Sequence, residues 1–370
     1  MNEKEKLVLQ LIKDNPFISQ LELANAVNLS RSTVANIISG LIKKEYVSGK
    51  AYVLNEVNPI ICIGGVNVDR KFYVTQDIVE KTSNPVTSSR SVGGVARNIA
   101  ENLGRLGEDI IMLSAAGNDS DWKEIYDLSS PFMNLDYVTQ FEDAATGSYT
   151  AVLDKHGDMF TALADMNIYD RITPELLSKN SNTLQKAKCI VADLNCPKET
   201  IDFLSSFTLK YQIPFVIVPV SSPKMNRLPK NLQAVHWLIL NKDETETFFN
   251  IQINNQQDFQ KAIENWLNLG VKNVIVTDGA NGVAASGKDG QVHFYPAIKA
   301  ETVVDVTGAG DAFCSAVIHS WLHKKSHEDV ISSGMVNAYK TLSSKYTVRQ
   351  ELSKHQLEFD MEELQNESIH

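Results

Sequence analysis

The sequence predicts an α/β protein: a doubly wound, mostly parallel sheet with a small β lid, preceded by a short helical domain. Three observations predict this fold. After residue 58, apolar runs alternate with helical patterns, and Gly or Asn follows several of the runs, whereas residues 1–57 show three helical patterns and a glycine turn. Repeated strand–helix alternation is typical of a parallel sheet covered on both faces.

The strands of the large sheet are predicted at six apolar runs: residues 59–63, 109–113, 189–194, 214–220, 236–240 and 273–277. Helices are predicted between most of them, including 96–106 and 259–269, where apolar residues recur at helical spacing. Ligands of such sheets bind beyond the carboxyl ends of the strands. Segments 66–76 and 147–165 do not fit the layered pattern and predict a separate small sheet, the lid.

The length of 370 residues fits a small domain at 1–57 and a large α/β domain at 58–370. No apolar run approaches the roughly 20 residues that span a bilayer, and the start lacks the layout of a signal peptide. None of the four cysteines shows C-x-x-C spacing, so we expect reduced thiols in a cytoplasmic protein: Cys62, Cys189, Cys196 and Cys314. Cys196 is expected to be a bystander rather than a reactive thiol.

The net charge of −10 argues against nucleic-acid binding by the whole molecule. Residues 1–57 nevertheless carry seven Lys and Arg against six Asp and Glu, which leaves a charge of +1 there. The remainder therefore carries −11. This difference suggests two parts with different partners.

The first 57 residues show three short helical patterns. Ser19 is predicted to cap the second helix, and Ser30 or Ser32 the third. Residues 46–54 then alternate around a Gly turn, as in a two-stranded wing. The order helix, helix, helix, wing resembles the winged helix-turn-helix of bacterial transcription regulators.

That resemblance implies DNA binding through the third helix. Four residues would face the major groove, Arg31, Ser32, Thr33 and Asn36, and three would lie near phosphates, Lys43, Lys44 and Lys50. A charge of +1 is a weak electrostatic footprint, so binding would require a dimer. The alternative is a small helical module that contacts another protein.

The stretch 305–311, Asp-Val-Thr-Gly-Ala-Gly-Asp, is the most informative motif. An apolar, strand-like approach at 302–304 leads into Gly308, Ala309 and Gly310, and a helical pattern follows. Small residues at a helix start leave backbone N–H groups bare, which makes an anion site. Asp311 would repel a bound phosphate unless it takes a proton from an attacking hydroxyl. The alternative is a glycine turn whose Asp favours the helix dipole.

Four further motifs occur in a fixed order before this loop. They are Gly64-Gly65-Val66-Asn67-Val68-Asp69, Gly93-Gly94-Val95-Ala96-Arg97-Asn98, Asn241-Lys242-Asp243-Glu244, and Thr277-Asp278-Gly279-Ala280-Asn281-Gly282. Each is weak alone, because a Gly-Gly helix start is often a turn and an Asn-x-x-Glu pair is usually a cap. Together with the Gly308 loop, over about 310 residues, they resemble the ribokinase-type (PfkB) family of carbohydrate and nucleoside kinases.

Within that family the chain most resembles the pseudouridine kinases, in segments 93–100, 165–168, 191–195 and 306–311. A ribose kinase would be expected to carry Lys where Val95 stands and an acidic residue where Asn195 stands. Both departures favour a nucleoside-like substrate.

The resemblance implies a ribokinase-like fold and a role for each matching residue. The catalytic group would comprise Asp311 as base, with the backbone N–H groups of Gly308, Ala309 and Gly310 on the transferring phosphoryl. The substrate would be bound by Asn67, Asp69, Gly94, Asn98, Asn195, Asp311 and, in the lid region, Asn167. Asn241, Thr277, Gly279, Gly282, Gly308, Gly310 and Asn337 would bind ATP.

Two metal sites are also implied. Asn241 and Glu244 would organise Mg²⁺ through water, and Asp305 and Thr307 would help to hold a monovalent cation such as K⁺. Arg97 could steady phosphate charge, but we expect an exposed helix Arg there. A homodimer is expected, because relatives often pair through their lids.

The implied activity is ATP-dependent phosphorylation of the 5′-hydroxyl of a ribonucleoside, pseudouridine above all, by a cytoplasmic enzyme with a fused DNA-binding module. One alternative is a kinase for another ribonucleoside or sugar. The other is a transcription regulator that uses a kinase fold only to sense its ligand.

Overall fold

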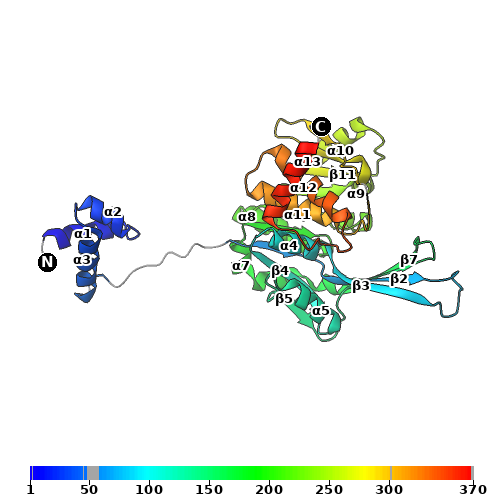
Figure 1. The fold of residues 1–370 in the computed structure, drawn as a ribbon, viewed down its shortest axis with the longest axis horizontal. Helices are drawn as coiled ribbons and strands as arrows, with labels where there is room; N and C mark the ends of the chain where they lie inside the picture. The colour runs from blue at the N-terminus through cyan, green and yellow to red at the C-terminus, as the bar shows by residue number, and fades with distance from the viewer. Residues whose placement is uncertain (2, 45, 48–57, 301, 368–370) are drawn as a thin grey trace. The chain divides into compact units, whose positions relative to one another are not determined.

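The structure is a computed structural model that describes residues 1, 3–44, 46–47, 58–300 and 302–367. It divides into two compact units, Met1–Val57 and Asn58–His370 (Figure 1). None of the described helices is both long enough and apolar enough to cross a membrane.

Three helices build the small unit: α1 (Glu3–Asp14), α2 (Gln20–Ala26) and α3 (Arg31–Lys43). Ser19 caps α2 in a reciprocal pair with Glu22. Ser30 caps α3 by accepting from the backbone N–H of Thr33, which settles the choice between Ser30 and Ser32. Apolar side chains from all three helices are buried between them: Val8, Leu9, Leu23, Ala24, Val34, Ile38 and Leu41.

The predicted wing at 46–54, with its Lys50, lies outside the described residues except for Tyr46 and Val47. Tyr46 donates its backbone N–H to the carbonyl oxygen of Leu41 at 3.0 Å. The wing therefore stays a prediction from the sequence.

A nine-stranded sheet forms the centre of the large unit, in the order β13-β12-β11-β10-β9-β8-β1-β4-β5. Neighbouring strands from β11 through β5 are parallel, and β12 and β13 are antiparallel at one edge. The bounds are β1 Ile60–Ile63, β4 Ile110–Gly117, β5 Val138–Phe141, β8 Cys189–Asp193, β9 Phe215–Val218, β10 Val235–Asn241, β11 Asn273–Thr277, β12 Val283–Ser286 and β13 Val292–Tyr295. The six predicted strands and the mostly parallel α/β fold are confirmed.

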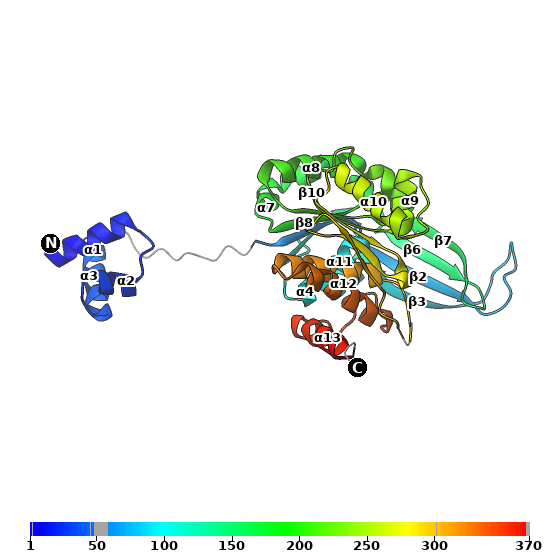
Figure 2. The same ribbon diagram turned by 90° about the horizontal axis from the view of Figure 1, so that it is seen from above.

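Helices cover both faces of this sheet, as Figure 2 shows. One face carries α7 (Ser181–Gln185), α8 (Lys198–Tyr211), α9 (Lys242–Phe249) and α10 (Gln256–Asn268). The other carries α4 (Val95–Arg105), α11 (Ala309–Leu322), α12 (His327–Leu342) and α13 (Lys354–Glu367). Two more helices are α5 (Ser120–Ser129) and α6 (Pro174–Lys179). The central strands are apolar throughout because both of their faces are buried.

A separate four-stranded sheet projects from the large one, in the order β3-β2-β6-β7 (Figure 1). It comprises β2 (Asn67–Val74), β3 (Val86–Gly93), β6 (Ser148–Leu153) and β7 (Met159–Asp165). Segments 66–76 and 147–165 account for β2, β6 and β7. Strand β3 was not predicted, because its sequence, Val-Thr-Ser-Ser-Arg-Ser-Val-Gly, is too polar to read as an apolar run.

One local expectation is wrong. Residues 302–304 form no strand: Val304 donates its N–H to the carbonyl oxygen of Leu342, at the end of α12, and its side chain is exposed. Near the C-terminus, Asp360 on α13 is buried and pairs with buried Arg349 at 2.6 Å.

Candidate active site

The order of the parallel strands brings many of the predicted residues to one edge of the large sheet. Asn241 ends β10 and Thr277 ends β11, and the two are register partners. Asp193 ends β8, and Gly64 follows β1, the strand that pairs with β8. The residues expected to bind nucleotide thus lie at β10 and β11, and those expected to bind substrate lie near β8 and β1.

The buried carboxylate of Asp193 joins the turns on the substrate side. Its Oδ2 accepts hydrogen bonds from the backbone N–H groups of Gly65 and Ala96, both at 3.0 Å. Its Oδ1 accepts from the backbone N–H of Asn195 at 2.8 Å. Burial raises the pKa of Asp193, whereas these N–H donors lower it. No role was predicted for Asp193, although an acid at the end of a buried strand was a usable signal.

Asn67 and Asp69 lie in β2, where the small sheet meets the glycine turns. The Nδ2 of Asn67 donates to Asp69 Oδ1 at 2.6 Å. Gly94, at the start of α4, has a φ of +104°, and a Cβ there would collide with the carbonyl oxygen of Gly65. Burial raises the pKa of Asp69 to about 6, against the lowering effect of nearby cations and of the Asn67 amide.

Asp311 lies in the first turn of α11, which packs against α4. The side-chain Nδ2 of Asn98, in α4, donates to Asp311 Oδ2 at 2.8 Å. Burial, together with the negative charges of Asp193 and Asp69, raises the pKa of Asp311 to about 7, although the Asn98 hydrogen bond lowers it. As a whole residue, Asp311 is partly exposed. A carboxyl with this pKa can take up and release a proton at neutral pH.

Arg97 is buried, with only 2% of its side chain exposed, so the expectation of an exposed helix Arg is wrong. Its Nε donates to Ser129 Oγ at 3.0 Å, and its Nη2 pairs with the Glu101 carboxylate. Its Nη1 donates to Asn98 Oδ1 at 3.1 Å. Because Arg97 engages the oxygen of the Asn98 amide, the amide nitrogen faces Asp311. Arg97 therefore orients the group that holds Asp311.

The loop before α11 has the features of an anion site. Gly308 has a φ of +87°, and a Cβ there would collide with the carbonyl oxygen of Thr347. Helix α11 begins at Ala309, and no side chain in the described part of the chain caps it. A Cβ at Gly310 would meet no atom within 4 Å, so open space adjoins the helix start. The backbone N–H of Ala309 lies 3.4 Å from the carbonyl oxygen of Val306, and those of Gly308 and Gly310 remain accessible to an anion.

Asp305 and Thr307 do not fit a monovalent cation as they lie. The Asp305 carboxylate contacts the ammonium of Lys71, from the small sheet, at 2.5 Å. It also accepts from Thr307 N at 2.9 Å and from Thr307 Oγ1 at 2.7 Å. A positive charge already occupies the position beside this carboxylate, and we derive no step through K⁺.

Asn241 and Glu244 form a reciprocal cap at the start of α9. The Asn241 side chain accepts from Glu244 N, and Glu244 Oε2 accepts from Asn241 N, both at 2.8 Å. Burial raises the pKa of Glu244 to about 7, partly offset by the Asn241 N–H. Among the described residues, no group donates a hydrogen bond to the second carboxylate oxygen. That oxygen and the amide fit a hard cation held through water.

The remaining nucleotide-side residues lie beside a pocket of about 480 Å³. Gly282 lines it together with Asp278 and Lys242, and Gly279 and Thr277 adjoin Asp278 in the chain. The structure does not bring Asn337 there. Its amide is fully buried in α12 and bonds to Ala312 O at 2.9 Å.

Asn195 and Asn167 lie on the substrate side. The buried Asn195 accepts from the ammonium of Lys224 through Oδ1, a contact that the sequence analysis missed. Asn167 follows β7 and is exposed. Tyr169, two residues later, donates its hydroxyl to the carbonyl oxygen of Val66 and ties this segment to the Gly65 turn. No residue spacing pointed to Lys224 or Tyr169.

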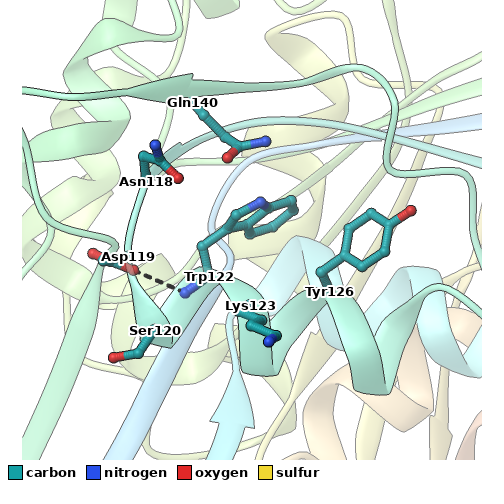
Figure 3. A pocket seen from close by; sticks show the side chains of 7 residues that line it. All are labelled: Asn118, Asp119, Ser120, Trp122, Lys123, Tyr126 and Gln140. Atoms are coloured by element: carbon teal, nitrogen blue, oxygen red, sulfur yellow. Dashed lines mark hydrogen bonds between the residues drawn. The ribbon is translucent and has the colours of Figure 1, made fainter.

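A second hollow, of about 560 Å³, lies at the beginning of α5 and includes none of the predicted site residues (Figure 3). Its lining is Asn118, Asp119, Ser120, Trp122, Lys123, Tyr126 and Gln140. Asp119 caps α5 by accepting from Trp122 N at 2.9 Å. We assign this hollow no part in the site.

In the small unit, the described residues predicted to contact DNA are all exposed: Arg31, Ser32, Thr33, Asn36, Lys43 and Lys44. All but Lys44 lie on α3, and Lys44 follows it directly. Lys44 pairs with Glu5 at 2.9 Å, which lowers its availability to phosphates.

Two family models match the chain. Residues 58–352 match the model described as pfkB family carbohydrate kinase. Residues 1–48 match the model described as winged helix-turn-helix DNA-binding.

The chain is also similar to individual proteins over most of its length. The chain is 30% identical to the "uncharacterized sugar kinase YeiI" of Escherichia coli, over 89% of this chain and 90% of that one. It is 30% identical to the pseudouridine kinase of Escherichia coli, over 81% and 95%. It is 27% identical to the guanosine-inosine kinase of Exiguobacterium acetylicum, over 78% and 95%.

Solved structures share the fold. A carbohydrate kinase from Agrobacterium tumefaciens superposes with a TM-score of 0.72 at 25% identity, covering 82% of this chain and 97% of that chain. Ribokinase of Arabidopsis thaliana, complexed with ribose and ATP, gives 0.73 at 19% identity, over 82% and 99%. The second likeness concerns the fold alone.

Asp311→Asn should stabilise the large unit at high pH. A folded-state pKa of about 7, raised from 3.8, means that the stability contributed by Asp311 is complete below pH 4 and is lost as pH rises through 7. From pH 5 to pH 8, the difference in the free energy of unfolding between variant and parent should therefore change by about 2–4 kcal/mol in favour of the variant. Urea unfolding followed by tryptophan fluorescence measures this, because all four tryptophans lie in the large unit. Asp127→Asn, which neutralises an exposed carboxylate on α5, is the matched control; equal pH dependence in both variants would contradict the prediction.

Proposed function

The chain belongs to the pfkB family of carbohydrate kinases, and we propose that it phosphorylates the 5′-hydroxyl of a ribonucleoside, pseudouridine above all, with ATP. One observation carries the proposal: the Asp311 carboxyl, held by Asn98, lies at the uncapped start of α11. A carboxylate beside a bound phosphate would repel it, so the presence of an acid at this position needs a reason. Removing the proton of an attacking alcohol supplies that reason.

In the proposed reaction, Asp311 accepts the proton of the 5′-hydroxyl as its oxygen attacks the γ-phosphorus of ATP. A new O–P bond forms, the bond from the γ-phosphorus to the β,γ-bridging oxygen breaks, and ADP leaves. The N–H groups of Gly308, Ala309 and Gly310 stabilise the charge on the transferring group. Asp69, Asn67 and Asn98 hold the ribosyl hydroxyls.

Mg²⁺, when bound with ATP, would neutralise phosphate charge during transfer. Glu244 and Asn241 would hold it through water at the start of α9. The rest of the nucleotide would lie along Thr277, Gly279 and Gly282, beside the pocket that Gly282 lines. Asn337 is left out of this proposal because its amide is buried between helices.

A nucleoside is favoured over a free sugar for two reasons. Val95 and Asn195 stand where a ribose kinase would carry Lys and an acid, and the relatives include kinases named for pseudouridine and for guanosine and inosine. Asn167, exposed after β7, is the proposed contact to the base.

For the small unit we propose DNA binding through α3. The match to a DNA-binding family and the exposure of Arg31, Thr33 and Asn36 support it. A homodimer would present two copies of α3 to DNA and so double the weak electrostatic attraction of one small unit. A pure sensor of nucleosides is the second candidate, since a DNA-binding unit is fused to the kinase unit, but a sensor needs no base at the position of Asp311.

A substrate panel tests the proposed reaction. With ATP and Mg²⁺, pseudouridine should give the fastest ADP release among pseudouridine, uridine, guanosine, inosine, ribose and deoxyribose. A 5′-deoxynucleoside should bind without releasing ADP, because it lacks the attacking oxygen. ADP release with sugars alone would replace the nucleoside by a sugar, and binding of nucleosides without any release would favour the sensor.

Asp311→Asn should lower turnover by about 10²–10⁴-fold with the Kd for ATP nearly unchanged, because the base is lost and the anion site is kept. In the parent, kcat/KM should rise about tenfold per pH unit below 7 and level off above it, since the base must be deprotonated and its pKa is about 7. Steady-state rates from pH 5 to pH 9 measure both effects. Near-normal turnover of the variant would remove Asp311 from this role.

The intact protein should bind DNA from the region next to its own coding sequence, with affinity that falls steeply from 50 to 200 mM salt. Arg31→Ala should weaken binding by about tenfold, whereas Lys13→Ala removes an equal charge at an exposed position of α1 and should matter less. Gel shift or fluorescence anisotropy measures this. If neither low salt nor added nucleoside gives binding, a protein-contact role replaces the DNA-binding one.

A further inference from the structure

Helix α11 carries a second cluster of ligating side chains at the end opposite to Asp311. His319 lies in its last turn and His323 is its C-cap residue, and their rings approach Glu108, in the segment between α4 and β4. Glu108, His319 and His323 each offer one potential metal-ligand atom, and these three atoms lie within 4.8 Å of one another.

The two imidazoles converge on a single oxygen. His319 Nδ1 and His323 Nε2 each lie 2.8 Å from Glu108 Oε1. The ring centroids are 4.4 Å apart. The His319 and Glu108 side chains are only 8% and 7% exposed, and that of His323 is 39% exposed. The cluster is thus built on a buried base and is open to solvent on one side.

We propose that Glu108, His319 and His323 bind a borderline divalent transition-metal ion such as Zn²⁺, Co²⁺ or Ni²⁺. Two imidazole nitrogens and one carboxylate oxygen are donors that such ions prefer, whereas Mg²⁺ and Ca²⁺ prefer oxygen ligands alone. The open side at His323 leaves a fourth position for water. This site is independent of the Mg²⁺ proposed at Glu244.

Small movements suffice to admit the ion. Bonds of about 2.0–2.1 Å in a tetrahedral site place ligand atoms about 3.3 Å apart. Each imidazole must therefore withdraw from Glu108 Oε1 by roughly 0.5 Å. The imidazole nitrogens that now donate N–H to the carboxylate must lose that proton to bind a metal through a lone pair. Protons therefore compete with the metal for these nitrogens.

The surrounding charges hold the carboxylate ready. Lys188 Nζ lies 2.9 Å from the other oxygen, Oε2, which leaves Oε1 to the imidazoles. Burial alone would raise the pKa of Glu108. The hydrogen bonds from His319, Lys188 and His323 outweigh burial and lower this pKa to about 2. The negative end of the α11 dipole adds a favourable field for a cation. Lys188 opposes that field and should moderate the affinity.

Position along α11 separates this site from the reaction centre. His319 and His323 lie eight and twelve residues after Asp311, or about 12 and 18 Å along the helix axis. A bound ion would tie the end of α11 to the turn that joins α4 and β4. The site should therefore change the stability of the large unit without supplying a group to phosphoryl transfer.

Titration calorimetry of the untagged, full-length protein with ZnCl₂ tests the proposal, in excess Mg²⁺ to occupy the hard-ligand site. One equivalent should bind, and Co²⁺ should give the visible absorption of a tetrahedral site. His323→Ala should weaken this binding at least about tenfold, and it should fold because His323 is a half-exposed helix-end residue. His355→Ala, which removes an exposed histidine on α13, should bind as the parent does.

Lys188→Met provides an independent check, because it removes a positive charge without removing a ligand. Zn²⁺ affinity should rise in this variant, and unchanged affinity would count against Glu108 as a ligand. The proposal is overturned if the parent binds no Zn²⁺ at micromolar concentrations, or if His323→Ala and His355→Ala bind it alike. Thermal unfolding should show a rise in Tm with Zn²⁺ for the parent and no rise for His323→Ala.

Discussion

The buried carboxylate of Asp193 is the constraint on which the substrate side of the large unit depends. It accepts N–H groups from the turn after β1, from the start of α4 and from the segment after β8. Leaving such donors unsatisfied in a buried position would cost about 1–3 kcal/mol each. By meeting all three, Asp193 fixes the start of α4, and α4 in turn carries Asn98 to Asp311.

Several carboxylates lie close together around Asp311, where burial makes their charged forms unfavourable. Burial raises the pKa of Asp311, and the negative charges of Asp193 and Asp69 raise it further. Buried Arg97 offsets part of this repulsion and holds the Asn98 amide in one orientation. A group poised near neutral pH thus costs stability, and sites of this kind commonly trade stability for reactivity.

Local patterns in the sequence were enough to predict the six central strands of the large sheet, since they read as apolar runs, but not its edge strands β5, β12 and β13. The glycine turns were also predictable, because close backbone approaches at Gly94 and Gly308 leave no room for a side chain. The failures depend on tertiary structure. Strand β3 is polar and exists through its pairing with β2, and Arg97 looks solvent-facing until Glu101 and Ser129 are placed beside it. Lys224 and Tyr169 reach the site from distant segments that no spacing connects.

As the base, Asp311 must touch the attacking oxygen. A crystal structure of the protein with pseudouridine and a non-transferable ATP analogue measures this contact. The 5′-oxygen should lie about 2.6–3.2 Å from an Asp311 carboxylate oxygen, with the γ-phosphate at the first N–H groups of α11. An Asp311 carboxylate turned away from every substrate hydroxyl, with the γ-phosphate bound elsewhere, would contradict it.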